Sequence, residues 1–411
     1  MVKEKCKGIN VLSIKYKTKK EEGKMTNLLI KLFIKDENIK DVNVRGKYGT
    51  LSSVTGIIVN ILLSVVKLII GIIANSMSII SDGLNNITDA GSSVVTMIGF
   101  KMSQKKVDND HPWGHGRMEY ITAFIVDMLI ILVGFELFQS SIDKIIHPSM
   151  PDIGTVTLVI LVIAIIAKLW LFVFYKKIAK LINSEAIKGN AYDSISDVIS
   201  TFVVLLSAII AKFVGVSIDG YVSILVSIFI LFTGGKALKE TVDILLGAKP
   251  DPELVKGIED FTKKYNMIVG IHDMMIHDYG PGRKIVSFHA EVPANSDICK
   301  AHDIIDQMEQ DILEEFNCIT TIHMDPIVVD NEEINEMREI TENIVKTINS
   351  EYSIHDFRMT DGGGRINLIF DLVVPREDDV DKDKLKKNIQ EKIHSTNPKY
   401  YAVPKIECSY V

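Results

Sequence analysis

The sequence predicts a membrane α-helical bundle of six transmembrane helices, followed by a soluble α+β tail that is duplicated. Three observations predict this fold class. The chain is strongly apolar between about Leu51 and Leu246, although only 47% of its 411 residues are hydrophobic overall. Beyond Lys249 it becomes charged. Within that charged part, one pattern occurs twice at a separation of roughly 80 residues, which indicates two similar subdomains.

Six segments are candidates for the membrane helices, because a helix needs roughly 20 mostly apolar residues to cross a bilayer. All six are too long for the strands of a soluble core. A buried six-helix soluble core is the alternative, and it fits this length and hydrophobicity poorly. The segments are Leu51–Ile73, Met77–Met102, Met118–Ser141, Ile153–Tyr175, Ala186–Val214 and Gly220–Leu238.

The loop charges predict the orientation of these helices in the cell membrane. Two loops on the same side are basic, with Lys101, Lys105, Lys106, Arg117, Lys176, Lys177, Lys180 and Lys188. The loops on the other side carry little beyond Lys144. The positive-inside rule therefore places both termini in the cytoplasm. The N-terminus has no apolar signal-peptide region, and the sequence leaves open whether translation starts at Met1 or Met25.

The tail predicts the order helix, strand, strand, helix, strand. The elements are Pro252–Lys264, Gly270–Tyr279, Lys284–Val292, Ser296–Phe316 and Thr320–Ile327. The segment IHDMMIHDYGPGRKIVSFHAEVP, which begins at Ile271, is similar to the later segment IHDFRMTDGGGRINLIFDLVVP, which begins at Ile354. This order suits a small split-βαβ sandwich. The predicted boundaries are 1–47 for an N-terminal tail, 48–246 for the membrane domain, 247–329 for the first soluble repeat and 330–411 for the second.

Composition argues against several functional classes. The net charge of −7 comes mainly from the tail, so nucleic acid is not an expected partner. The four cysteines form no CxxC motif and suggest no disulfide framework. The chain contains no nucleophile–base set, P-loop or glycine-rich fingerprint, so we expect neither an enzyme nor a bound organic cofactor.

Two polar pairs inside the apolar helices point to the function. Asn85 and Asp89 lie four residues apart in one helix, and Asp193 and Asp197 repeat that spacing in another. Each pair therefore shares one helix face. A carboxylate inside a bilayer is costly and is a functional candidate by default. Interhelical hydrogen bonding remains the alternative, above all for Asn85.

The three acids of these pairs would repel one another strongly unless they held a cation or protons. With the amide oxygen of Asn85, they offer only oxygen ligands, as a divalent cation site requires. We therefore expect a site that exchanges a divalent cation for protons. Other polar groups in the apolar helices, Asp127, Glu136 and Lys168, could form interhelical pairs or face the same cavity.

The motifs SMSIISDGLNNITDA and HPWGHGRMEY together resemble the cation diffusion facilitator family. The resemblance covers about Tyr48 to Asp325. It implies six membrane helices, a homodimer, a ferredoxin-like cytoplasmic domain and proton-coupled efflux of divalent cations. In that family the second and fifth helices each supply a pair to the transport site, and here those pairs are Asn85/Asp89 and Asp193/Asp197.

The chain departs from the zinc pattern of the family, in which the first residue of the pair is usually histidine or aspartate on the second helix and histidine on the fifth. Asn85 and Asp193 stand there instead. Zinc favours nitrogen and sulfur, whereas oxygen-only sites suit harder ions such as Mn²⁺. The pattern resembles the manganese branch, so we favour Mn²⁺. An exporter of Zn²⁺, Fe²⁺, Co²⁺ or Cd²⁺ stays open, as does a metal-sensing membrane protein with little flux.

Two further clusters match metal sites of the family. Asp108, His111 and His115 lie in the loop DNDHPWGHG and match a second site of some members, although a loop-stabilising role is the alternative. In the tail, the matching residues are His272, His289, His302, His323 and Asp325. A regulatory divalent cation, Mn²⁺ or Zn²⁺, would bind there.

The second repeat serves as an internal comparison for the tail cluster. His272 is repeated by His355, whereas His289 corresponds to Asp371, His323 to about Glu407, and His302 to no histidine. We therefore expect the second repeat to pack without metal.

Overall fold

The structure, a computed structural model, describes residues 24–34, 41–73, 77–147, 155–214, 219–361, 363–375, 378 and 380–408. The start of the chain and the predicted beginning of one helix at Ile153 lie outside the described residues. The chain forms two compact units. One contains Asn43–Met97 and Leu129–Gly234, and the other contains Ile98–Met128 and Gly235–Val411.

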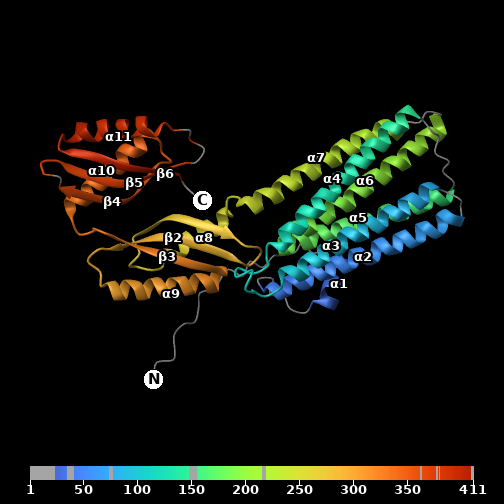
Figure 1. Cartoon of the computed structure of the whole chain (residues 1–411), viewed down its shortest axis with the longest axis horizontal. Helices are drawn as coiled ribbons and strands as arrows, with labels where there is room; N and C mark the ends of the chain where they lie inside the picture. The colour runs from blue at the N-terminus through green and yellow to red at the C-terminus, as the bar shows by residue number, and fades with distance from the viewer. Residues whose placement is uncertain are drawn as a thin grey trace, which may run out of the picture. The chain divides into compact units, whose positions relative to one another are not determined.

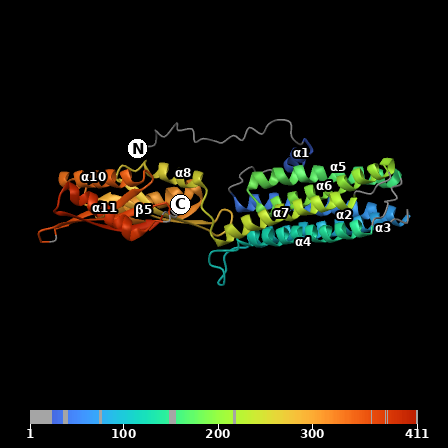
Figure 2. The same cartoon turned by 90° about the horizontal axis from the view of Figure 1, so that it is seen from above.

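Six long helices correspond to the six predicted spans and run alongside one another (Figures 1 and 2). The six long helices are α2 (Val42–Ile73), α3 (Met77–Ser103), α4 (Met118–Ile146), α5 (Thr155–Ile182), α6 (Glu185–Val214) and α7 (Asp219–Leu246). A short helix, α1 (Lys24–Phe33), precedes them. Several extend beyond the predicted apolar stretches. Amphipathic residues at the edge of a membrane segment continue the helix, although they lower its hydrophobicity.

Length and composition alone identify four of the described helices as able to cross a membrane. The qualifying segments are Asn43–Ile70, Met118–Ile146, Leu158–Ile182 and Gly220–Leu246, which belong to α2, α4, α5 and α7. α3 and α6 are of similar length, 27 and 30 residues, but they carry the polar pairs Asn85/Asp89 and Asp193/Asp197. Their polar residues lower the mean hydropathy on which such a test depends.

Buried polar contacts fix the helices of the first unit around α3. The hydroxyls of Ser93 in α3 and Tyr175 in α5 lie 3.1 Å apart. Asn190 in α6 donates to Thr96 Oγ1 in α3 over 2.9 Å. Gly56 lets α2 approach the same place, because a Cβ there would come within 1.7 Å of the Tyr175 hydroxyl. These contacts hold α2, α5 and α6 against the face of α3 that carries its acid.

The soluble part consists of two similar repeats, which confirms the predicted duplicated α+β tail. The first contains α8 (Pro252–Thr262), β1 (Gly270–Asp278), β2 (Lys284–Pro293), α9 (Ile298–Phe316) and β3 (Cys318–Ile327). The second contains α10 (Glu332–Ile348), β4 (Ser353–Asp361), β5 (Ile366–Val374), α11 (Lys382–Thr396) and β6 (Tyr400–Cys408). In each repeat an antiparallel pair is joined by a parallel third strand, in the orders β1-β2-β3 and β4-β5-β6.

Local sequence explains where the helices of the repeats begin. Asp251, Asp297, Asn331 and Asp381 each accept a hydrogen bond from a backbone N–H of the first helical turn. These caps satisfy donors that have no partner within the helix. α9 then buries Ala301, Ile305, Met308 and Ile312, whose spacing places them on one face. Asn317 ends α9 in the left-handed conformation that often closes a helix.

The two sheets share an irregularity at the same place. The pairing of β1 with β2 shifts register just after His272, and that of β4 with β5 shifts just after His355. The following residues, Asp273 and Asp356, have φ angles of 51° and 50°. Aspartate tolerates this left-handed conformation better than most residues. The shared bulge shows that the IHD motif encodes the same local geometry in both repeats.

The strand register corrects one correspondence predicted between the repeats. His289 and Asp371 are equivalent, because each pairs with the histidine of its IHD motif. On the next strand His289 pairs with His323, and Asp371 pairs with Lys405. Lys405 is therefore the counterpart of His323. The predicted match between His323 and Glu407 was wrong, because the last strands share too little sequence to set their alignment.

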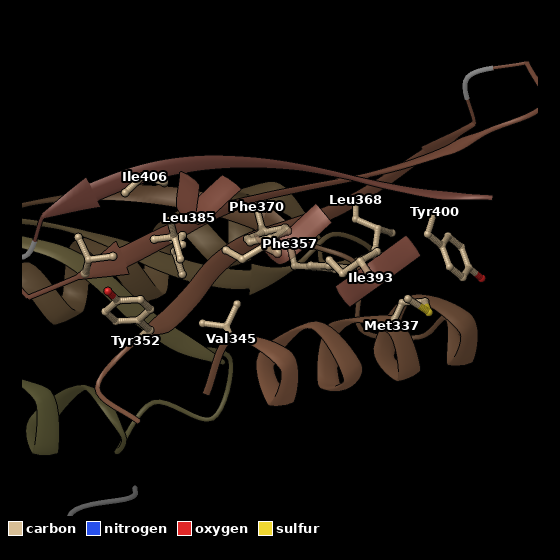
Figure 3. Close-up of a cluster of buried hydrophobic side chains, with 13 residues drawn as sticks. Met337, Val345, Tyr352, Phe357, Leu368, Phe370, Leu385, Ile393, Tyr400 and Ile406 are labelled. Atoms are coloured by element: carbon tan, nitrogen blue, oxygen red, sulfur yellow. The ribbon is translucent and has the colours of Figure 1, made fainter. Parts of the chain in front are cut away.

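Each repeat has its own apolar core. Figure 3 shows the second, in which Met337 and Val345 of α10 lie opposite Phe357 and Phe370 of the sheet. Ile393 of α11 belongs to the same cluster. The two helices contact each other and pack against the sheet. The second repeat therefore has the packed interior of a folded subdomain.

Truncating Phe370 to alanine is expected to destabilise the second repeat by about 3–5 kcal/mol, because its fully buried ring fills the centre of that core. Hydrogen exchange of the β4, β5 and β6 amides in the full-length protein, followed by mass spectrometry, measures the effect. Val403→Ala is the control, since that side chain is 48% exposed. Equal exchange in the two variants would contradict this description of the core.

Candidate metal centres

Three carboxylates from two helices meet inside the first unit. Asp89 of α3 and Asp193 and Asp197 of α6 each offer an oxygen within 4.8 Å of the others. Asp89 is buried, and the two acids of α6 are partly buried. We call these three residues the carboxylate triad. Asn85 lies one helical turn before Asp89 and is partly buried.

A lysine whose role the sequence left open contacts two acids of the carboxylate triad. Lys168 of α5 donates to Asp89 Oδ2 over 2.7 Å and to Asp197 Oδ2 over 2.5 Å. Its side chain is only 4% exposed. Of the two roles that the sequence left open for Lys168, the structure shows interhelical pairing, and it does so at the acids themselves. The ammonium therefore joins α5 to both acidic helices.

The loop residues Asp108, His111 and His115 form a second group. Asp108 contacts His111 Nδ1 at 3.0 Å and His115 Nε2 at 3.3 Å, through different carboxylate oxygens. Lys105 also approaches Asp108, at 2.8 Å. Its hydrogen bond holds the pKa of Asp108 well below the usual range. The Nδ1 atom of His115 is buried without a hydrogen-bond partner. The chemistry of this group suits metal binding and also suits hydrogen bonds that stabilise the loop.

The same loop is docked on the turn between β1 and β2. Arg117 donates two hydrogen bonds to the carbonyl of Asp278, over 3.0 and 2.9 Å. Arg283 donates to the carbonyl of Trp113 over 3.3 Å. Gly280, whose φ is +114°, leaves room for the backbone of Gly116, which a Cβ would meet at 2.3 Å. The loop with the histidines thus contacts this turn through Asp278, Gly280 and Arg283.

The third group lies on the sheet of the first repeat, with one residue from each strand. Asp325 of β3 lies 2.8 Å from His289 Nδ1 and 3.2 Å from His272 Nε2 through one carboxylate oxygen. Its other oxygen lies 3.2 Å from His323 Nε2. His323 is an outer member, since its side chain is 67% exposed and its ring lies 4.7 Å from that of His289. We call His272, His289 and Asp325 the tail triad.

His272 distinguishes this group from a set of ordinary hydrogen bonds. Its side chain is 2% exposed, and neither ring nitrogen has a partner with hydrogen-bond geometry, although acids lie within 3.5 Å on both sides. A buried polar nitrogen without a partner costs free energy. A metal ion is one ligand that would satisfy such a nitrogen, and the two imidazoles with a carboxylate suit a transition metal.

The structure separates His302 from this group. It lies on the exposed face of α9, where its Nδ1 atom is 3.5 Å from Asp306. Among the described residues, the group around Asp325 consists of strand residues and does not include His302. The phase of α9 sets this position, because the buried face of the helix is formed by Ala301, Ile305, Met308 and Ile312.

A fourth group, which sequence analysis did not identify, spans the two repeats. Asp273 of β1 offers an oxygen close to Asp371 of β5 and Glu407 of β6. Lys405 lies 3.8 Å from Asp371 and also pairs with Glu407. Burial raises the pKa of the Asp371 carboxyl. The second repeat therefore keeps acids at two positions equivalent to the tail triad, and a lysine at the position of His323.

The IHD histidines of the two repeats stack on each other. The rings of His272 and His355 have centroids 4.9 Å apart and planes inclined by 8°. Burial and the neighbouring His272 lower the pKa of His355 to about 4. His355 is therefore neutral at physiological pH, which suits stacking against another imidazole. Equivalent residues of the repeats thus meet within one chain.

Comparison with protein families gives two matches. Residues 53–246 match the cation efflux transmembrane domain, and residues 250–327 match the cytoplasmic domain of cation efflux proteins. The carboxylate triad and Lys168 lie within the first match, and the tail triad lies within the second. The second repeat lies beyond both.

Several curated proteins are similar in sequence. An uncharacterised transporter of Methanocaldococcus jannaschii is 29% identical over 251 residues, which is 61% of this chain and 88% of that protein. The cation-efflux pump FieF of Escherichia fergusonii is 27% identical over 60% of this chain and 82% of its own length. The manganese efflux system protein MneS of Bacillus subtilis is 28% identical over 69% of this chain and 96% of its own length.

If the tail triad binds a divalent cation, saturating Zn²⁺ or Mn²⁺ will slow hydrogen exchange in β1, β2 and β3 of the full-length protein. An ion at about 100 times its Kd stabilises its bound form by about 2.7 kcal/mol. His289→Ala and Asp325→Ala should lose this protection, because each removes a ligand. His302→Ala should keep it, because His302 lies apart. Loss of protection in the His302 variant alone would contradict the grouping.

Proposed function

The chain belongs to the cation diffusion facilitator family, and from this premise we propose that it exports Mn²⁺ from the cytoplasm in exchange for protons. The family assignment makes it a multi-pass divalent cation efflux transporter with a cytoplasmic C-terminal domain, and not an enzyme. The preference for Mn²⁺, the exchange for protons and the residues involved are the proposal.

The observation that carries the proposal is the donor set of the carboxylate triad. Asp89, Asp193 and Asp197 bring three oxygen ligands together on α3 and α6, and Asn85 can add an amide oxygen from the preceding turn. Hard divalent ions such as Mn²⁺ prefer oxygen ligands, whereas zinc sites usually contain nitrogen or sulfur. The similarity to a protein named as a manganese efflux system supports the same ion.

Proton exchange follows from the charge on these residues. When the ion leaves, the repulsion between the remaining carboxylates favours protonation. When an ion enters, it displaces those protons because metal ligands must be deprotonated. The same carboxylates thus bind the metal ion and protons in turn, and a proton gradient can drive the metal ion outward.

The remaining parts of the proposal concern assembly and location. We place the protein in the cell membrane with both termini in the cytoplasm, as a homodimer, a state that the match to the cytoplasmic domain suggests. We keep 48–246 as the transport domain, with 247–329 and 330–411 as the two tail repeats. The loop group, Asp108, His111 and His115, is an additional metal site in this proposal.

Two alternatives have specific support. Export of Zn²⁺, Fe²⁺ or Co²⁺ is the first, because pumps described only as cation-efflux proteins are also similar to the chain. A metal-sensing membrane protein with little flux is the second, and the histidines of the tail triad favour it. Uptake of each ion by reconstituted protein separates these possibilities, since a sensor would bind metal without transporting it.

Replacing any acid of the carboxylate triad by alanine is expected to abolish Mn²⁺ uptake into inside-out proteoliposomes that carry a pH gradient. Asp89→Ala, Asp193→Ala and Asp197→Ala each remove a metal ligand and a proton acceptor together. Asp143→Ala is the matched control, because that acid of α4 is 76% exposed. Uptake at the wild-type rate by the Asp193 and Asp197 variants would rule out the triad as the transport site.

Introducing imidazoles should shift the ion preference. The double variant Asn85→His/Asp193→His is expected to raise the ratio of Zn²⁺ to Mn²⁺ transport, because imidazole suits zinc better than an amide or carboxylate oxygen does. Both ions are measured in the same proteoliposome assay, at matched protein content. If the ratio stays unchanged while the variant still transports metal, ligand type at these positions does not set the preference.

A further inference from the structure

Lys168 contacts the carboxylate triad directly, and the proposed exchange has given it no role. It stands in an otherwise apolar part of α5, with the sequence LVILVIAIIAKLWLFVF around it. A charged lysine in such a position is costly unless it is paired. The pairing here is with acids on two different helices, Asp89 on α3 and Asp197 on α6.

The ammonium group of Lys168 contacts two of the three carboxylates that the proposed function assigns to the cargo ion. It contacts one oxygen of Asp89 and one oxygen of Asp197, the residues whose oxygens converge with that of Asp193. An ammonium is a compact point charge on a flexible four-carbon stem, and it offers only donors. It can neutralise carboxylates, but it cannot share their oxygens with a metal ion at no cost.

The charges of the site support this role. The three ionised carboxylates carry three negative charges, and Lys168 offsets one of them. A divalent cation offsets the other two, so that the loaded site with its lysine has no net charge. Uncompensated charge in a low-dielectric region is strongly unfavourable. Without Lys168, the empty site would keep three negative charges instead of two and would attract a divalent ion more strongly.

We propose that Lys168 is a tethered cation that occupies the carboxylate triad between transport events and yields carboxylate oxygens to the entering divalent ion. This inference rests on the proposed transport function and adds a residue that sets ion affinity. By competing for Asp89 and Asp197, the lysine weakens ion binding, and by returning to them it promotes release. An exporter needs both effects, because an ion held too tightly leaves slowly.

A purely structural ion pair would behave differently. If Lys168 only held α3, α5 and α6 together, its removal would loosen the site and weaken metal binding. If it competes with the ion, its removal strengthens binding and slows turnover. The two roles therefore predict opposite changes in the Kd for Mn²⁺.

The test measures Mn²⁺ binding by titration calorimetry and transport in proteoliposomes, with the full-length protein. Lys168→Met is expected to bind Mn²⁺ roughly tenfold more tightly than the wild type or better, because one close positive charge is removed. Its maximal transport rate is expected to fall. Lys176→Met is the matched control. It removes a charge from the same helix two turns on, where the lysine is exposed and lies over the ring of Phe172. Both of its values should match the wild type.

A second pair of variants guards against misfolding, since Lys168→Met leaves three acids without their internal cation. Asp89→Asn removes one negative charge from the site, and Asp89→Asn/Lys168→Met restores the net charge of the wild-type empty site. The double variant should bind Mn²⁺ more tightly than Asp89→Asn alone. Equal or weaker binding when Lys168 is replaced, in either background, would overturn the proposal.

The outcomes also separate this inference from the proposed function. If the wild type moves no divalent cation in the vesicles, the transport proposal fails first. If the wild type transports Mn²⁺ and the Lys168 variants bind it with unchanged affinity, only the tethered-cation role fails.

Discussion

The need to compensate buried negative charge governs the first unit of this protein. Three carboxylates on α3 and α6 each place an oxygen within 4.8 Å of the others, in a largely apolar part of the chain. Such an arrangement persists only if positive charge or protons offset the repulsion. Lys168 supplies one charge from α5. The hydrogen bond between the Ser93 and Tyr175 hydroxyls and the one that Asn190 donates to Thr96 hold the same helices nearby.

Lysine side chains also pair with clustered carboxylates in the second unit. Lys105 pairs with Asp108 in the loop group, and Lys405 pairs with Asp371 and Glu407 between the repeats. In three of the four acid-containing groups, a lysine therefore contacts the carboxylates. The tail triad differs, because imidazoles surround its carboxylate, Asp325. Its buried His272 nitrogens lack hydrogen-bond partners, which makes this group the one most in need of a ligand in the soluble part.

Much of this architecture could be predicted from local sequence. Hydrophobic length identified the long helices, and the repeated IHD motif identified two subdomains, because both signals depend on residues close together in the chain. Helix periodicity also placed Asp193 and Asp197 on one face of their helix. The expectation that this pair meets Asp89 came from the cost of burying acids and from the family resemblance, because periodicity within one helix does not show which helices pack together.

The remaining features of the fold and of the sites depend on tertiary contacts that cannot be inferred from a single sequence. Nothing in the apolar run around Lys168 reveals that α5 faces both acidic helices. The equivalence of Lys405 and His323 required the strand register, and the separation of His302 from the strand histidines within one chain required the phase of α9. The group around Asp273 required both the left-handed bulge and the meeting of two repeats.

The most direct test of the central claim is the anomalous scattering of Mn²⁺ in crystals of the transport-competent protein. The account predicts a peak in contact with the carboxylate oxygens of Asp89, Asp193 and Asp197, with the Lys168 ammonium withdrawn from at least one of its two acids. A saturating Mn²⁺ soak that leaves Lys168 on both Asp89 and Asp197, with the ion bound elsewhere in the helices, would contradict it.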